Sequence, residues 1–146
     1  MSAARHYRIY HKLQIASHRI QKSADRAILS DAPLTTAQTA VLGLVEKAGE
    51  VSQKCIADQL GLHESAVTTM VSRLGKLGFM SKRRDEKDRR VWLLSVTNEG
   101  KQAREAAGPA FARINQRIES ELSDEEIAKL ADMLDRLNRR FSSGDT

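Results

Sequence analysis

The segment from residue 52 to residue 77 constrains the fold most, because its spacing is typical of two short helices joined by a tight turn. Ser52 is a favourable N-cap for a helix over 53–60, and Gly61 stands where a left-handed C-cap is preferred. The next helix is expected over 64–77, where the apolar residues form one stripe. That stripe consists of Val67, Met70, Val71, Leu74 and Leu77.

The opposite face of the helix expected over 64–77 carries hydroxyl groups and long cationic side chains. A helix that enters the DNA major groove needs such side chains, because they reach base edges and phosphates. The sequence therefore predicts a helix–turn–helix whose second helix contacts DNA. The predicted contact residues on this face are Ser65, Thr68, Thr69, Ser72, Arg73 and Lys76.

Residues 80–97 change to a period of two, which predicts a β-hairpin. The hairpin lacks an Asn-Gly or Asp-Gly pair, so we expect a longer tip and not a two-residue turn. Arginines at such a tip can enter a narrow minor groove, where the negative potential is strongest. A solvated charged loop is the alternative interpretation of the same residues. The cations concerned are Arg84, Lys87, Arg89 and Arg90.

The N-terminal part of the chain predicts two further helices. The first, over 5–29, has apolar residues at helical spacing and ends near the breaker at 30–33. The second opens at Thr35, which forms a capping box with Gln38, and continues to Gly49. The apolar positions of the first helix are Ile9, Leu13, Ala16, Ile20, Ala24 and Ile28.

The C-terminal part predicts a fifth helix from Thr97 to about residue 120, which Pro109 is expected to kink or interrupt. A second capping box, Ser123 with Glu126, opens the last helix. Its apolar residues recur at near-heptad spacing, so they need a partner, either within the chain or in a second copy. These residues are Ile127, Leu130, Met133 or Leu134, Leu137 and Phe141.

Length and charge limit the class of protein. The chain has 146 residues with 40% hydrophobic residues, which is enough for one compact domain. Its net charge of +5 suggests a polyanionic partner, and residues 51–96 alone carry nine basic and five acidic residues, or +4. No apolar stretch is long enough to span a bilayer and the N-terminus has no apolar signal region, so we expect no membrane partner and a cytoplasmic location.

The residues also argue against an enzyme or a metalloprotein. We find no Gly-rich phosphate loop, no nucleophile with an evident base, and no metal-ligand spacing, so no cofactor, catalytic residue or metal site is predicted. The single cysteine, Cys55, cannot form an intrachain disulfide or supply a cysteine-rich zinc site.

Three segments in the same order and spacing resemble the MarR family of winged helix–turn–helix regulators. They are LTTAQTAVL, IADQLGLHESAVTTMVSRLGKLGFM and KRRDEKDRRVWLLSVTNEG, and the resemblance covers nearly the whole chain. It implies a mainly α fold with a small β-hairpin wing, in which a winged helix–turn–helix region (34–97) lies between an N-terminal dimerisation helix (1–33) and C-terminal dimerisation helices (98–146). The three parts would form one interlocked domain.

The resemblance also implies a function. A homodimer would read a palindromic operator in double-stranded DNA with helix 64–77 as the recognition helix. Asp88 and Arg90 match the family's Asp-x-Arg pair, in which the arginine reaches the minor groove and the aspartate orients the hairpin. The protein would then be a transcriptional regulator, expected to be a repressor released by a small aromatic or acyl-type effector.

Three positions depart from the family pattern. His63 stands where a stronger N-cap is usual, so the recognition helix is expected to be less firmly capped. Thr69 replaces a frequent basic residue, which leaves the operator sequence open. Gly75 lies inside the recognition helix and should cost about 1 kcal/mol relative to Ala.

The first helix offers candidate effector ligands in Tyr7, His11, His18 and Arg19, with His6 and Tyr10 nearby. They suit an anionic ligand, although exposed or interface polar residues are the plainer interpretation, and a zinc site is weaker still because no fourth ligand is evident. Two alternatives to an effector-controlled regulator stay open. One is a sequence-indifferent architectural DNA-binding protein, and the other is a redox or copper sensor based on Cys55, for which a filler cysteine is the plainer interpretation.

Overall fold

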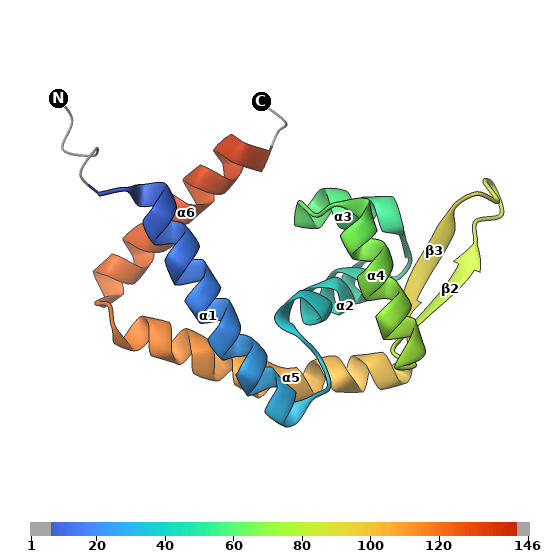
Figure 1. Cartoon of the computed structure of the whole chain (residues 1–146), viewed down its shortest axis with the longest axis horizontal. Helices are drawn as coiled ribbons and strands as arrows, with labels where there is room; N and C mark the ends of the chain where they lie inside the picture. Colours follow the sequence, from blue (N-terminus) through green and yellow to red (C-terminus); the bar gives the residue numbers. More distant parts are fainter. Residues whose placement is uncertain (1–6, 143–146) are drawn as a thin grey trace.

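The computed structural model describes residues 7–142, which form six α-helices and a three-stranded antiparallel sheet. In chain order the elements are α1 (Ile9–Asp31), α2 (Thr36–Ala48), β1 (Val51–Ser52), α3 (Gln53–Leu60), α4 (Glu64–Lys76), β2 (Met80–Arg84), β3 (Trp92–Val96), α5 (Asn98–Ser120) and α6 (Asp124–Ser142). Figure 1 shows α2, α3, α4 and the wing at one end, α1 and α6 at the other, and α5 running along both. The expected fold class, mainly helical with a small β wing, is confirmed.

Capping residues set most of the helix ends. Thr35 and Gln38 form the predicted capping box: the Thr35 hydroxyl accepts from the Gln38 N–H at 3.2 Å, and the Gln38 side chain accepts from the Thr35 N–H at 3.0 Å. Ser52 caps α3 by accepting from the Cys55 N–H, and Gly61 ends that helix in the left-handed region with φ 64°. These are the boundaries that the sequence predicts.

The C-terminal helices follow the same rule. Ser123 and Glu126 form the second capping box, with two hydrogen bonds of 3.2 Å. Thr97 caps α5 by accepting from the Gly100 N–H at 3.1 Å. Gly100 is required there by space, because a Cβ at this position would collide with the carbonyl oxygen of Phe79.

Two predicted helix descriptions are corrected. The described part of α1 begins at Ile9 and ends at Asp31, later at both ends than the predicted 5–29, and residues 1–6 lie outside the described part of the chain. Its start has no side-chain cap to mark it, and its end is set by Ala32, which is extended because it precedes Pro33. In addition, α5 runs as one helix through Pro109, so of the two outcomes predicted there, a kink or an interruption, the interruption is wrong. Buried Ala107 and Ala110 hold the helix on both sides of that residue.

The sheet contains one strand that the sequence did not predict. β1 pairs with β3 through Val51↔Leu94 and Ser52↔Leu93, so the strand order is β1-β3-β2. A two-residue strand has too few positions to show an alternating pattern, which is why the sequence gives no signal for it. A smaller correction concerns Leu77, which is the C-cap of α4 and 41% exposed, and so lies outside the buried stripe.

The core lies in the winged unit, where α2, α3 and α4 pack with one another and the sheet. Its largest fully buried side chains come from the end of α1, from α2 to α4, and from β3. Within the described chain, no single helix has the length and apolar character to cross a membrane, although α1 and α2, bent by 73°, meet those limits when counted together. The fully buried residues are Ile28, Leu34, Val41, Leu42, Val45, Ile56, Val67, Leu74 and Leu94.

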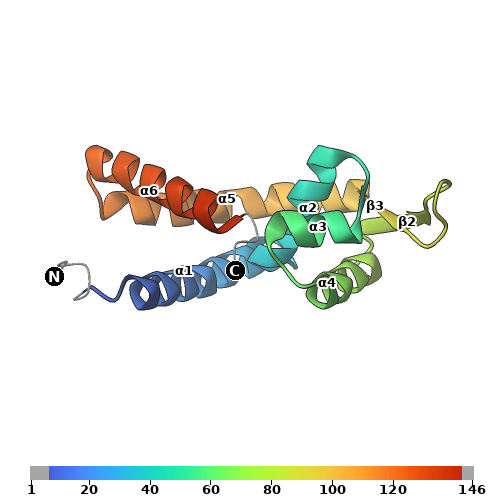
Figure 2. The same ribbon diagram turned by 90° about the horizontal axis from the view of Figure 1, so that it is seen from above.

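The apolar stripes of α1 and α6 lie largely uncovered. α6 has no buried residue. The two helices overlap in Figure 1, but the view from above in Figure 2 shows them apart. In α1 only Ala24 and Ile28 are buried, whereas Ile9, Leu13 and Ile20 are 40–52% exposed.

Candidate nucleic-acid interface

The helix–turn–helix is formed by α3 and α4. The turn closes when the Leu62 N–H donates to the Ala57 carbonyl at 3.0 Å, and α4 then packs through Val67, Val71 and Leu74. Every polar residue predicted to contact DNA from α4 is exposed, so the structure brings them together on one surface. These residues are Ser65, Thr68, Thr69, Ser72, Arg73 and Lys76.

Two of the hydroxyl groups on this surface are already hydrogen bonded within the protein. The Thr68 hydroxyl donates to the Glu64 carbonyl at 2.9 Å and accepts from Gln53 Nε2 at 2.6 Å, while the Thr69 hydroxyl donates to the Ser65 carbonyl at 3.1 Å. Gln53 thereby links α3 to the exposed face of α4. Sequence reasoning missed this residue, because the bond joins two helices across the turn.

The departures at His63 and Gly75 have structural counterparts. His63 is the N-cap of α4 and makes no side-chain capping bond, as the sequence predicts, while Glu64 supplies a negative charge in the first turn. At Gly75 a Cβ would lie 3.9 Å from the Met80 carbonyl oxygen, which is ordinary contact distance. Space therefore does not require glycine at this position.

The wing consists of β2 and β3, joined by the tip loop 85–91. The pairing is antiparallel from Met80↔Val96 to Arg84↔Trp92, and the Ser81 and Ser95 hydroxyls are 2.9 Å apart across the strands. A tip longer than two residues is therefore confirmed. The wing projects from the molecule beside α4 (Figure 1).

Arg83, near the tip end of β2, ties the wing to the turn before β1. Its guanidinium donates to both carboxylate oxygens of Glu50, at 2.8 Å and 2.6 Å. This hydrogen bond, and then the charge of Arg83, lower the pKa of Glu50, and the same pair raises the pKa of Arg83. Sequence reasoning missed the pair, because its members are far apart along the chain.

Asp88 and Arg90 form a local pair at the wing tip. Asp88 Oδ1 accepts from both the backbone N–H and the Nε of Arg90, each at 3.1 Å, and Oδ2 accepts from Nη2 at 3.3 Å. The side-chain bond to Arg90, followed by the backbone bond, lowers the pKa of Asp88. The Arg90 side chain is 91% exposed, so its guanidinium is oriented and still accessible.

The remaining predicted wing residues lie close to this pair. Lys87 and Arg89 are exposed on the tip loop, and Arg84 is at the end of β2. The structure therefore gathers the predicted wing cations at one end of the molecule. Lys82 and Trp92, which were not predicted as site residues, lie on the adjoining strands.

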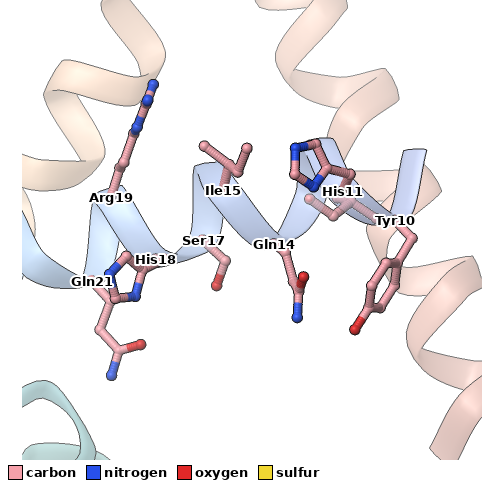
Figure 3. A pocket seen from close by; sticks show the side chains of 9 residues that line it. Tyr10, His11, Gln14, Ile15, Ser17, His18, Arg19 and Gln21 are labelled. Carbon is pink, nitrogen blue, oxygen red and sulfur yellow. The ribbon is translucent and has the colours of Figure 1, made fainter. Parts of the chain in front are cut away.

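The candidate effector residues all lie on the N-terminal half of α1 or just before it, and all are exposed. His11, His18 and Arg19 line a hollow formed by α1 alone, and Tyr7 lies in an adjoining hollow with His11 and Arg19. Figure 3 shows Arg19 projecting to one side of the helix and Tyr10 and Gln14 to the other. The described chain by itself therefore does not enclose a ligand here.

Cys55 and the histidines show no built site in the described part of the chain. Cys55 is half-buried in α3, where its sulfur accepts from Gln59 Nε2 at 3.3 Å. Between residues 7 and 142, no three His, Cys, Asp or Glu side chains are grouped so that they could hold a metal ion. His6 lies outside the described residues.

Comparisons with known proteins agree with this geometry. A family model described as the MarR family matches residues 34–92. The chain is 35% identical over 98 residues to the HTH-type transcriptional repressor MdtR of Bacillus subtilis (strain 168), and the match covers 67% of this chain and 63% of MdtR. The matched part thus spans less than two thirds of that relative.

Solved structures match over more of the chain. The PcaV transcriptional regulator from Streptomyces coelicolor, solved in complex with its natural ligand, is 29% identical with a TM-score of 0.74, and the match covers 85% of this chain and 89% of PcaV. The YusO protein from Bacillus subtilis is 30% identical with a TM-score of 0.63, covering 95% of this chain and 99% of YusO.

Proposed function

Since the chain belongs to the MarR family, a family of transcriptional regulators and not of enzymes, we propose that it is a homodimeric regulator that binds DNA in a sequence-specific manner. The observation that carries the proposal is the position of the exposed polar face of α4 beside a basic wing on one closed core. A regulator of bacterial transcription acts where the DNA is, so we expect it to work in the cytoplasm.

In this proposal α4 enters the major groove. Arg73 and Lys76 reach phosphates or guanine edges, and the threonine methyl groups suit thymine. Thr68 and Thr69 keep their hydroxyl protons within the helix, so their oxygens and methyl groups are what they present to DNA. The remaining contacts on this helix are assigned to Ser65 and Ser72.

The wing tip enters the adjoining minor groove. Arg90 makes the contact with the groove and Asp88 orients its guanidinium, which agrees with their pairing and with the exposure of Arg90. Lys87 and Arg89 flank the pair and are assigned to phosphates. Arg84 lies behind them on β2.

Dimerisation would cover the uncovered apolar stripes. Met133, Leu134, Leu137 and Phe141 on α6 are 38–79% exposed, which is unusual for large apolar side chains in such number on one helix face. A second copy presents the same stripe, so a two-fold interface would bury both. Two recognition helices one DNA turn apart, roughly 34 Å, would then read a palindromic operator.

Repression follows if the dimer occupies a promoter, and release follows if an effector binds better to a dimer with differently spaced recognition helices. The similarity to the repressor MdtR and to the ligand-bound PcaV supports this control scheme. We assign the effector contacts to Tyr7, His11, His18 and Arg19, with the partner chain completing the hollow along α1, and we expect an aromatic or acyl-type ligand.

The test is a fluorescence titration of the purified protein with its own upstream DNA and with a scrambled control, at about 150 mM salt. We expect tight binding to the native fragment alone, and about a tenfold loss in Arg90→Ala. The matched control is Arg139→Ala, which removes the same charge from α6 and should bind as the unmodified protein does. Equal affinity for both fragments would favour an architectural DNA-binding protein, and full affinity in Arg90→Ala would contradict the role of the wing.

A further inference from the structure

A cation–aromatic cluster lies on the wing and joins Arg84, one of the cations predicted to reach DNA, to Lys82 and Trp92, which the proposed DNA contacts do not use. The Cζ of Arg84 lies 3.8 Å from the centre of the Trp92 ring, and the Nζ of Lys82 lies 4.6 Å from it. A cation within about 6 Å of an indole ring is attracted by the electrons of its face. Trp92 is the single tryptophan of the chain.

The strand register explains why these three residues meet. Arg84 and Trp92 are direct cross-strand partners, and Lys82 lies two residues before Arg84, so all three side chains are on one face of the sheet. The same face carries Met80 and Leu94, which are buried against the helices. The cluster therefore continues the buried face of the sheet into the part of the wing that lies beyond the core.

Arg84 also connects this cluster to the tip loop. Its Nη1 donates to the Arg89 carbonyl at 2.8 Å, so the guanidinium is held on its face by Trp92 and on its edge by the loop. Within the loop, the Asp85 N–H donates to the Val91 carbonyl and the Val91 N–H to the Asp88 carbonyl, each at 2.9 Å. These bonds fix the backbone from which the Asp88–Arg90 pair projects.

The two faces of β2 thus have different anchors. Arg83, on the face opposite to Trp92, ties the strand β2 to Glu50. Arg84 ties the tip to the Trp92 ring. A wing anchored only through its strands would have to order its tip loop when DNA binds, which lowers affinity.

We propose that Trp92 is a positioning residue of the wing, which holds Arg84 on the Arg89 carbonyl and so presets the tip loop for the DNA minor groove. Arg84 then acts on DNA through the loop and not as a direct contact. The expected effect of Trp92 on DNA affinity rests on the proposed DNA-binding function. Its first step, the ordering of the tip by the ring, is a property of the protein without DNA.

The experiment compares Trp92→Leu with Trp92→Phe in the full-length protein. Amide hydrogen exchange without DNA should be faster at Asp85 and Val91 in Trp92→Leu, by about fivefold, and unchanged at Leu94 in the buried middle of β3. Trp92→Phe keeps an aromatic face and should stay near the unmodified protein. If Trp92→Leu fails to fold, Arg84→Met, which removes the cation and the donor, tests the same exchange.

DNA titrations of Trp92→Leu over a range of salt concentrations supply the second readout. We expect a loss of affinity of about fivefold per wing with the slope of log K against log salt unchanged, because no phosphate contact is removed. A decrease of about one unit per wing in that slope for Arg84→Met would show a direct phosphate contact and overturn the proposal. Unchanged amide exchange at the tip loop of Trp92→Leu would overturn the proposed role of Trp92, even if the protein binds DNA. Faster exchange at the tip loop in a protein that does not distinguish DNA sequences would contradict only the proposed DNA-binding function.

Discussion

The winged unit (α2 to β3) and the helical region (α1, α5 and α6) differ in how far their apolar side chains are buried. In the described chain the nine largest fully buried side chains all lie between residues 28 and 94, within or next to the winged unit. In α6 none is buried, although its apolar stripe is as regular as any in the sequence. A regular stripe therefore indicates that a helix needs a partner, and only the tertiary structure shows whether the chain itself supplies one.

The difference in burial corresponds to two kinds of function in one small protein. The winged unit has a closed core, which gives α4 and the wing a rigid support for polar contacts. The helical region leaves a surface that a second copy is proposed to cover. Under this view the first region determines which DNA sequence is read, and the second determines how far apart two such readers stand.

The largest effect is expected from a charge placed in the apolar stripe of α6. Leu134→Glu places a carboxylate in the proposed interface and should convert the dimer to a monomer in sedimentation experiments. Loss of the second recognition helix should lower the affinity for a palindromic site by about 100-fold. The winged unit should stay folded, because Leu134 does not contribute to its core.

The matched control is Ala128→Glu, which adds the same charge to the exposed polar face of the same helix, between Asp124 and Asp132. It should remain dimeric and bind DNA normally. A Leu134→Glu protein that stays dimeric would show that α6 is not at the interface, and the contrast between the two regions would then need another explanation.

An effect on stability, and not on assembly, is expected from a cavity in the closed core. Leu94 is fully buried on β3, the central strand, so Leu94→Ala should lower the free energy of unfolding by about 2–5 kcal/mol. Leu93→Ala, on the opposite and half-buried face of the same strand, serves as the control and should cost less. Urea unfolding followed by circular dichroism measures both. Equal losses would mean that the two faces of the sheet are not distinguished by packing.

The sequence predicted the local features of both regions and missed the contacts that join distant segments. Capping boxes at Thr35 and Ser123 and the left-handed Gly61 act within a few residues, so their chemistry is visible in the sequence. The Glu50–Arg83 pair spans 33 residues and depends on how the wing folds back. The contact between Arg84 and Trp92 depends on the strand register, which is set by a tip length that no turn motif specifies.

Pro109 and α6 show that local sequence does not by itself determine whether a helix is interrupted or buried. At Pro109 local chemistry predicts a kink or a break, and packing of α5 on both sides of the residue keeps the helix from breaking. In α6 the local pattern predicts a partner for the stripe, yet no part of the chain between residues 7 and 142 buries it. In each case the outcome depends on a neighbouring element and not on the segment itself.

The smallest effect is expected at the contact between α1 and α2, which connects the two regions. Asp25 on α1 accepts a hydrogen bond of 2.7 Å from the Thr36 N–H, one of the unpaired donors at the start of α2. Asp25→Ala should therefore cost about 1 kcal/mol in unfolding free energy, whereas Asp25→Asn, which keeps an acceptor, should recover part of it. If this hydrogen bond only stabilises the fold, folded Asp25→Ala should bind the operator with unchanged affinity. If instead α1 positions the winged unit through this bond, Asp25→Ala should weaken binding to a palindrome and leave binding to a single half-site intact. Titration with these two DNA fragments therefore decides whether the bond only stabilises the fold or also sets the spacing of the recognition helices.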